Sequence, residues 1–331
     1  MSAAGSAIRS PSMPNLRGAL QRNAWTLSLL GFLVILLVFT KVIQPSYNAR
    51  GIESLAVSVL PLALAAAAQA VIVIAGGIDL SIGSMMALTS VVAASNMDGQ
   101  SEGYAIGAVV GVLVLGLVLG AVNGALVVIT RVPDIVVTLA LSFVWAGFAL
   151  LVLRTPGGGS AEWLRSLVDG SVLIEWIPKA AVVLAVLVAV VWIPIQRSKL
   201  GLSLYAVGSN QLAAFRSGVS IGRTKFLAYV IGGLFAAMAG LTLTATTGIG
   251  TPVPGPYTLL SVAAIVLGGV SLAGGRGGLF GPMVAVVILS LLRTDMTFLR
   301  LNTNLATVAQ GVILVGVVML GTFIAYKREA E

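Results

Sequence analysis

Apolar stretches of about 20 residues, the length that a helix needs to cross a bilayer, alternate along the chain with short polar segments. Backbone groups inside the hydrocarbon must be hydrogen-bonded within their own element, so each stretch predicts a membrane-spanning helix. The ten predicted spans are Trp25–Ile43, Leu55–Ala75, Ser81–Met97, Tyr104–Ile129, Ile135–Leu153, Ala180–Ile195, Phe226–Thr247, Tyr257–Ala273, Leu279–Leu292 and Leu305–Tyr326.

The predicted fold is therefore an all-α, polytopic integral membrane protein with about ten transmembrane helices. The third and ninth stretches are short enough to be tilted or re-entrant. Residues 1–24 are expected to form a cytoplasmic leader and not a removed signal peptide, because no small-residue cleavage site follows them. Residues 25–326 form the transmembrane domain, with a cytoplasmic coupling segment at 200–225, and residues 327–331 form a tail.

Composition supports a membrane solvent and removes most enzyme chemistry. Hydrophobic residues make up 58% of the chain and charged residues only 9%, too few to cover a water-exposed surface. With no Cys and no His, disulfides, thiolate nucleophiles, Cys/His zinc sites and imidazole catalysis are excluded. Because the basic residues are scattered between apolar stretches, the net charge of +8 does not predict nucleic-acid binding. No metal or catalytic residue is predicted.

The basic residues also predict the orientation of the chain. If the N-terminus is inside, 12 of the 19 Lys and Arg residues fall in cytoplasmic segments, as the positive-inside rule requires. Both termini are therefore expected in the cytoplasm.

Glycines inside the fourth span form three small-xxx-small pairs, Gly107/Gly111, Gly116/Gly120 and Gly120/Gly124. Such pairs allow helix backbones to approach closely. They predict tight packing within the subunit, and a dimer seam is the alternative.

A first functional segment surrounds Gly76 and Gly77, a pair that favours a helix break. It resembles a second segment of the same chain, since residues 74–81 (IAGGIDLS) match residues 266–273 (VLGGVSLA). Transporters are often built from repeats with broken helices at corresponding places, so we expect two equivalent breaks. Asp79 either caps the third span or contacts a substrate.

A second segment is the long basic stretch before the seventh span. Asn210 is a suitable N-cap for a helix over 211–217, and Gly218 suits its C′ position. The helix would carry Leu212, Phe215 and Val219 on one face, and the small residues Ala213, Ala214 and Ser217 on another face, where a partner protein could sit close. The alternative is a surface helix that rests on lipid headgroups.

The glycine-rich stretch Leu267–Gly281 surrounds Arg276. It is not a phosphate-binding P-loop, because that motif ends in Gly-Lys-Ser/Thr and no Lys in this chain follows a Gly. We therefore expect a tight cytoplasmic turn, with any ATP hydrolysis on another protein.

These three segments, in this order, resemble the permease subunits of ribose-type sugar ABC importers. The resembling runs are GGIDLSIGS at 76–84, AVGSNQLAAFRSG at 206–218 and LGGVSLAGG at 267–275. The second is similar to the loop that contacts the ATPase in this family. The candidate coupling residues are Gly208, Asn210, Ala213, Ala214, Arg216, Ser217 and Gly218. The candidate path or helix-break residues are Gln69, Gly76, Gly77, Asp79, Ser81, Gly83, Asn123, Gly268, Gly269 and Ser271, and Trp145 is a further aromatic candidate.

The resemblance implies a translocation path for a monosaccharide in a prokaryotic plasma (inner) membrane. It implies as partners a second permease subunit, a cytoplasmic ABC ATPase and an extracytoplasmic sugar-binding protein, with surrounding lipid. No cofactor is expected on this chain, and ATP and Mg would be used by the ATPase. The chain departs from the family at Ser209, Val219 and Asp134; we expect Asp134 to pair with Arg131 or to contact a partner. The alternatives are an ion-coupled secondary transporter that uses Asp79, and a scaffold that transports nothing.

Overall fold

The computed structural model describes residues 24–253 and 255–301, with isolated positions from 305 to 319. Over these residues the chain is helical. The helices are α2 (Ala24–Ile43), α3 (Ala49–Ile74), α4 (Ile82–Met97), α5 (Glu102–Thr130), α6 (Asp134–Val152), α7 (Glu162–Val168), α8 (Lys179–Gln196), α9 (Lys199–Ser209), α10 (Gln211–Arg216), α11 (Ile221–Thr247), α12 (Tyr257–Leu267) and α13 (Phe280–Phe298).

Seven of the described helices are long and apolar enough to cross a membrane, namely α2, α3, α5, α6, α8, α11 and α13. The polytopic all-α prediction is confirmed. The third predicted span is short, as expected, because α4 has 16 residues. The ninth is not short, since α13 has 19 residues and continues through Arg293, where the apolar stretch had been taken to end. Instead the eighth is short, because α12 has only 11 residues before the glycine-rich stretch ends it. The predicted leader and most of the predicted last span lie outside the described residues.

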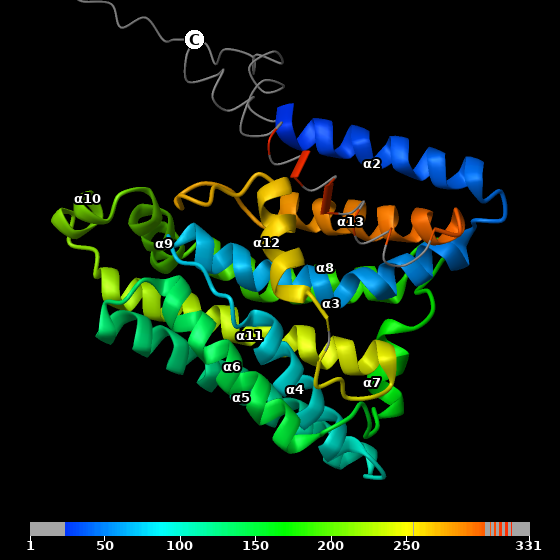
Figure 1. Ribbon diagram of the computed structural model, residues 1–331, viewed down its shortest axis with the longest axis horizontal. Helices are drawn as coiled ribbons and strands as arrows, with labels where there is room; N and C mark the ends of the chain where they lie inside the picture. Colours follow the sequence, from blue (N-terminus) through cyan, green and yellow to red (C-terminus); the bar gives the residue numbers. More distant parts are fainter. Residues whose placement is uncertain are drawn as a thin grey trace, which may run out of the picture.

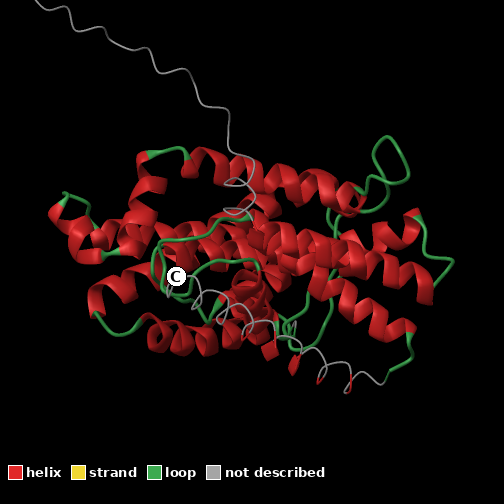
Figure 2. Ribbon diagram, turned by 90° about the horizontal axis from the view of Figure 1, so that it is seen from above, coloured by secondary structure: helices red, strands yellow, loops and turns green. Residues whose placement is uncertain are grey.

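The long helices run side by side along the long axis of the molecule, and α12 crosses them steeply (Figure 1; Figure 2). At the centre lies α3, which is buried at every position from Val59 to Ile74. A helix that is apolar on all sides belongs in a core. Its alanine-rich middle, with Ala at 65–68, lets neighbouring helices pack closely.

The glycine pairs of α5 divide into two groups. A Cβ on Gly120 would lie 3.0 Å from the Cα of Gly233 in α11, and one on Gly116 would lie 2.6 Å from the Gly233 carbonyl oxygen. Gly116, Gly120 and Gly124 therefore pack tightly within the subunit, as predicted. Gly107 and Gly111 have nothing within 4 Å, so that pair is not used in packing among the described residues.

The two ends of the bundle differ. One end carries α9, α10 and the glycine-rich stretch, and the other carries α7 and the turn from α2 to α3 (Figure 1). The segments that hydropathy and charge predict to be cytoplasmic gather at the α9–α10 end. Lys225 contacts Asp134 there, and the amide of Gly275 bonds the carbonyl of Ile74.

Candidate functional site

Three helix ends in the predicted functional segments have the same local structure. At the end of α3, the Gly76 and Gly77 amides donate to the carbonyls of Val73 and Ile72. This is the Schellman pattern, in which a residue with positive φ follows the helix. Gly76 has φ +78°. The α3 break predicted from the sequence is confirmed.

The same pattern recurs at the end of α12, where the Gly269 and Val270 amides donate to Val266 and Ile265, and Gly269 has φ +82°. The two resembling segments of the sequence are therefore two equivalent breaks, offset by one residue. The short helix α10 also ends this way, with φ +83° at Gly218. All three positions favour glycine because a side chain is strained at positive φ.

Backbones from the three segments touch one another at the α9–α10 end. The contact, which we call the glycine junction, consists of Gly76, Gly208, Gly274 and Gly275. A Cβ on Gly274 would lie 3.0 Å from the Cα of Gly76 and 3.1 Å from that of Gly208. A Cβ on Gly208 would lie 2.5 Å from the amide nitrogen of Gly275 and would collide with the carbonyl oxygen of Ile74. Only glycine therefore fits between the two helix breaks.

Side chains of α9 reinforce the glycine junction. The Tyr205 hydroxyl donates to the Gly277 carbonyl at 2.9 Å, and the Ser209 hydroxyl donates to the Gly275 carbonyl at 3.4 Å. Burial raises the pKa of Tyr205, because the phenolate loses hydration, so the hydroxyl keeps its proton at physiological pH. The helix that leads into α10 is thus tied directly to the loop between α12 and α13.

The Asp79 carboxylate lies fully buried in a polar network between α3 and α4. Its Oδ1 accepts from the backbone amide and the hydroxyl of Ser81, both at 2.7 Å, and its Oδ2 accepts from Asn123 at 3.0 Å. Asn123 in turn accepts from the Trp145 indole at 3.1 Å. Because all these groups are satisfied by one another, the network holds the break against α5 and α6.

This network corrects the position expected for Asp79. The N-cap of α4 is Ser81 and not Asp79; the Asp79 carboxylate accepts from the Ser81 amide from two residues earlier, in the buried core. Asn123 and Trp145, considered as path-lining residues, are likewise buried in the network. Their arrangement favours a structural role over direct contact with a solute.

From the sequence, Asp134 was expected to pair with Arg131 or to contact a partner, but in the structure Asp134 does not pair with Arg131. Its carboxylate lies 3.2 Å from the Lys225 ammonium and accepts from the Tyr229 hydroxyl at 3.1 Å. The Tyr229 hydroxyl also lies 3.3 Å from the Ile78 carbonyl. Lys225 is 91 residues from Asp134 in the sequence. Asp134, at the start of α6, thus joins α6 and α11 to the α3 break.

The predicted surface helix is present as α10. The Asn210 side chain accepts from the Ala213 amide at 2.9 Å, which confirms the N-cap. Leu212 and Phe215 are 60% and 66% exposed. Ala214 is 4% exposed, however, so it faces this chain and was wrongly placed on a face open to a partner. Ala213, Arg216 and Ser217 are exposed beside the apolar pair.

The remaining candidates lie apart from the glycine junction. Gly83 approaches the first turn of α12, where its amide bonds the Thr258 hydroxyl at 3.0 Å. Gly268 packs against the backbone of Gly281, which closes the glycine-rich stretch on itself. Gly269 lies under the Trp25 ring. Further candidates are placed as follows: Ser271 bonds within the stretch, Gly77 abuts Asp134, and Gln69 is buried in the middle of α3.

Several residues of this site were not singled out from the sequence. Thr138 accepts from the Leu80 amide at 3.1 Å and so holds the α3 break from α6. The helix α9 was treated as part of a loop, although Ser198 caps it by accepting from Leu200. A Ser followed by an apolar periodic run was the available signal. For Tyr229 and Lys225, no local signal identified the partner.

The described chain is thus a membrane-spanning helical protein whose core contains two broken helices, with the exposed short helix α10 at one end. The chain belongs to the family described as branched-chain amino acid transport system / permease component, whose model matches residues 51–320. It is a ribose-type ABC transporter permease and a multi-pass membrane protein.

Three relatives illustrate the family. The ribose import permease RbsC of Bacillus subtilis is 32% identical over 87% of this chain and 90% of its own length. The probable ABC transporter permease YphD of Escherichia coli is 34% identical over 91% of each. The autoinducer 2 import permease LsrC of Klebsiella pneumoniae is 35% identical over 59% of this chain and 57% of its own. No solved structure matches the chain significantly.

Proposed function

We propose that this permease forms the translocation path for a monosaccharide in the plasma (inner) membrane of a prokaryote. An extracytoplasmic binding protein delivers the sugar, a second permease subunit completes the path, and a cytoplasmic ATPase docks at α10. ATP and Mg are used by the ATPase, and this chain contributes no catalytic residue. Both termini lie in the cytoplasm, which puts the α9–α10 end inside. The ribose import relatives support this substrate class.

The observation that carries the proposal is the combination of α10 and the glycine junction. Leu212 and Phe215 offer an exposed apolar pair on a helix too short to be stable alone. Helix α9, which leads directly into α10, touches both breaks at Gly208. A partner that moves α10 would therefore act on both broken helices together, as rigid-body coupling requires.

The experiment is co-purification and transport with the partner ABC ATPase. We expect Phe215→Ala to weaken retention of the ATPase about tenfold or more, because apolar anchors dominate such interfaces. Leu202→Ala is the matched control, since Leu202 is 73% exposed on α9 but away from α10. Equal retention in both variants would favour the alternative in which α10 rests on lipid.

Transport separates the remaining alternatives. In proteoliposomes that hold the complete complex, ribose uptake is expected to require ATP inside the compartment corresponding to the cytoplasm. Uptake on a proton or sodium gradient without ATP would establish the ion-coupled class instead. The engaged, buried carboxylate of Asp79 argues against that class, because an ion site needs access to water.

A further inference from the structure

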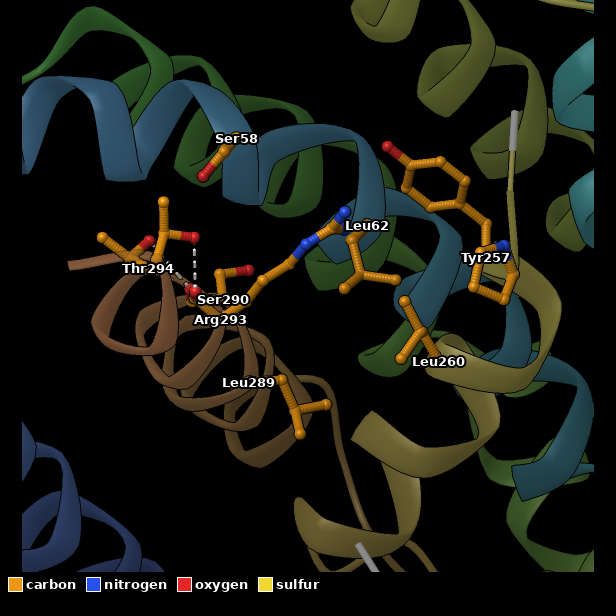
Figure 3. Close-up of a pocket in the computed structure, with 10 residues that line it drawn as sticks. Ser58, Leu62, Tyr257, Leu260, Leu289, Ser290, Arg293 and Thr294 are labelled. Atoms are coloured by element: carbon orange, nitrogen blue, oxygen red, sulfur yellow. Dashed lines mark hydrogen bonds between the residues drawn. The ribbon is translucent and has the colours of Figure 1, made fainter. Parts of the chain in front are cut away.

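A cavity of about 320 Å³ lies between α3, α12 and α13, in the half of the bundle away from α10. Small-molecule sites in proteins occupy roughly 300–1,000 Å³. The cavity walls come from the first half of α3, the first turn of α12 and the last turns of α13 (Figure 3). In the proposed orientation this half faces the extracytoplasmic side.

Among the described residues, Arg293 supplies the only charge in the cavity wall and forms no ion pair. Its side chain extends from α13 toward α3, past Leu62 (Figure 3). A charged group inside a membrane bundle is costly unless it pairs with another group or faces water or a ligand. Arg293 is exposed on the open side of the cavity, so its guanidinium is reachable from water and can donate hydrogen bonds to a polar solute there.

Three of the four serine and threonine hydroxyls in the wall can act as acceptors toward the cavity. Ser58, Thr294 and Thr297 each donate to a carbonyl in the preceding turn of their own helix, at 2.8–3.0 Å. Because their protons are used there, their remaining lone pairs are available to the cavity. Arg293 has only donors. The wall thus offers both kinds of partner, and the Tyr257 ring adds an apolar surface.

This mixture selects the chemical class of the solute. A sugar hydroxyl both donates and accepts, so it can bond the guanidinium and a wall hydroxyl at once. A bare anion would satisfy Arg293 but would face the lone pairs of Ser58 and Thr294. The wall is therefore better matched to a neutral polyol than to a carboxylate or phosphate.

The face of α3 that lines the cavity leads deeper into the bundle. Ser58, Leu62 and Gln69 are spaced by four and seven residues, so they lie on one helix face. Gln69 is about 16 Å farther along the axis than Ser58. Its amide is fully buried, and neither its nitrogen nor its oxygen has a hydrogen-bond partner among the described residues. Such a group is rare in a core and needs an explanation.

We propose that the cavity is an extracytoplasmic binding site for a neutral monosaccharide, with Arg293 as its main donor and the Gln69 amide as the next hydrogen-bonding position on the way inward. The assignment rests on the proposed function, whose substrate class it deepens. It adds a location and a specificity-determining residue, Arg293.

The chain has no cysteine, so a single introduced thiol reports on the site without background. In cells that express the full-length permease, Ser58→Cys is exposed to a membrane-impermeant maleimide. D-Ribose at ten times its dissociation constant is expected to slow labelling about tenfold by occupancy. Thr294→Cys provides a second reporter on α13 if Ser58→Cys does not fold. Ser46→Cys, exposed in the turn before α3, is the control that sugar leaves unprotected.

Arg293→Gln in the Ser58→Cys background is expected to raise the ribose concentration for half protection about tenfold or more, because the sugar loses a charge-assisted hydrogen bond. Arg50→Gln removes a charge at the same end outside the cavity and should leave that concentration unchanged. Labelling without protection by ribose or other neutral sugars overturns the site. Protection by ribonate or phosphate but not ribose overturns the ligand class. Labelling needs neither ATP nor partners, so protection by ribose can be measured even if ATP-driven uptake fails. A failure of the binding site is therefore distinguishable from a failure of the proposed function.

Discussion

Gly208 offers the sharpest test of how α10 acts on the helix breaks. In Gly208→Ala, the new methyl group would collide with the Ile74 carbonyl oxygen and lie 2.5 Å from the Gly275 nitrogen. These two atoms form a hydrogen bond of 3.0 Å between the two breaks. All the colliding atoms are backbone, so no side chain can rotate away, and the glycine junction must separate.

The cost has two parts. Overpacking costs about 1–3 kcal/mol, and leaving the buried amide and carbonyl unpaired costs about 1–3 kcal/mol more. A penalty of about 3 kcal/mol changes the ratio of two packed arrangements roughly a hundredfold. We therefore expect Gly208→Ala to insert in the membrane and to retain the ATPase, but to lose most ATP-driven uptake while ATP hydrolysis continues.

The assay compares sugar uptake with phosphate release in the same proteoliposomes. Gly111→Ala is the matched control, because a Cβ there meets nothing within 4 Å and the residue also lies in a helix. If Gly208→Ala transports as many sugars per ATP as Gly111→Ala does, the glycine junction does not transmit motion, and the reasoning from backbone contact is refuted.

Other predictions concern the stability of the bundle in detergent. Lys225→Ala is expected to cost about 2 kcal/mol, because the Asp134 carboxylate keeps only its tyrosine partner, and adding Asp134→Ala should restore part of the melting temperature. Gly120→Val should cost about 3 kcal/mol or more against α11, whereas Gly107→Val, in open space, should be tolerated in size-exclusion profiles. Trp145→Phe removes one indole hydrogen bond and should lower stability by about 1 kcal/mol; an unchanged melting temperature would show that the buried network contributes little.

Structural features that depend only on neighbouring residues in the chain were predicted well. The Asn210 cap and the C′ glycine at Gly218 need only a few adjacent residues, and the structure has both. The two helix breaks followed from the paired glycines at 76–77 and 268–269. Each of these features is a local backbone requirement, which the sequence states directly.

Contacts between distant segments were not predictable in this way. Asp134 is three residues from Arg131 in the sequence but bonds Lys225, 91 residues later, because α6 and α11 meet at the α3 break. The length of α13 was underestimated because Arg293 interrupts the apolar stretch. The available signal was the recurrence of polar residues at 290, 294 and 297, which is one helical face continuing past the apolar stretch.

Helix α3 connects the two proposed sites. Ile74, at its end, bonds the glycine junction, and Ser58 and Leu62, near its start, line the cavity. Ile74 and Ser58 are 16 residues apart, which is about 24 Å along a helix. Because α3 is buried and closely packed from Val59 to Ile74, we expect it to transmit displacement along this part of its length. Motion of α10 would therefore reach the cavity through α3 on one side and through the α12–α13 loop on the other, so that docking inside and binding outside act on the same three helices.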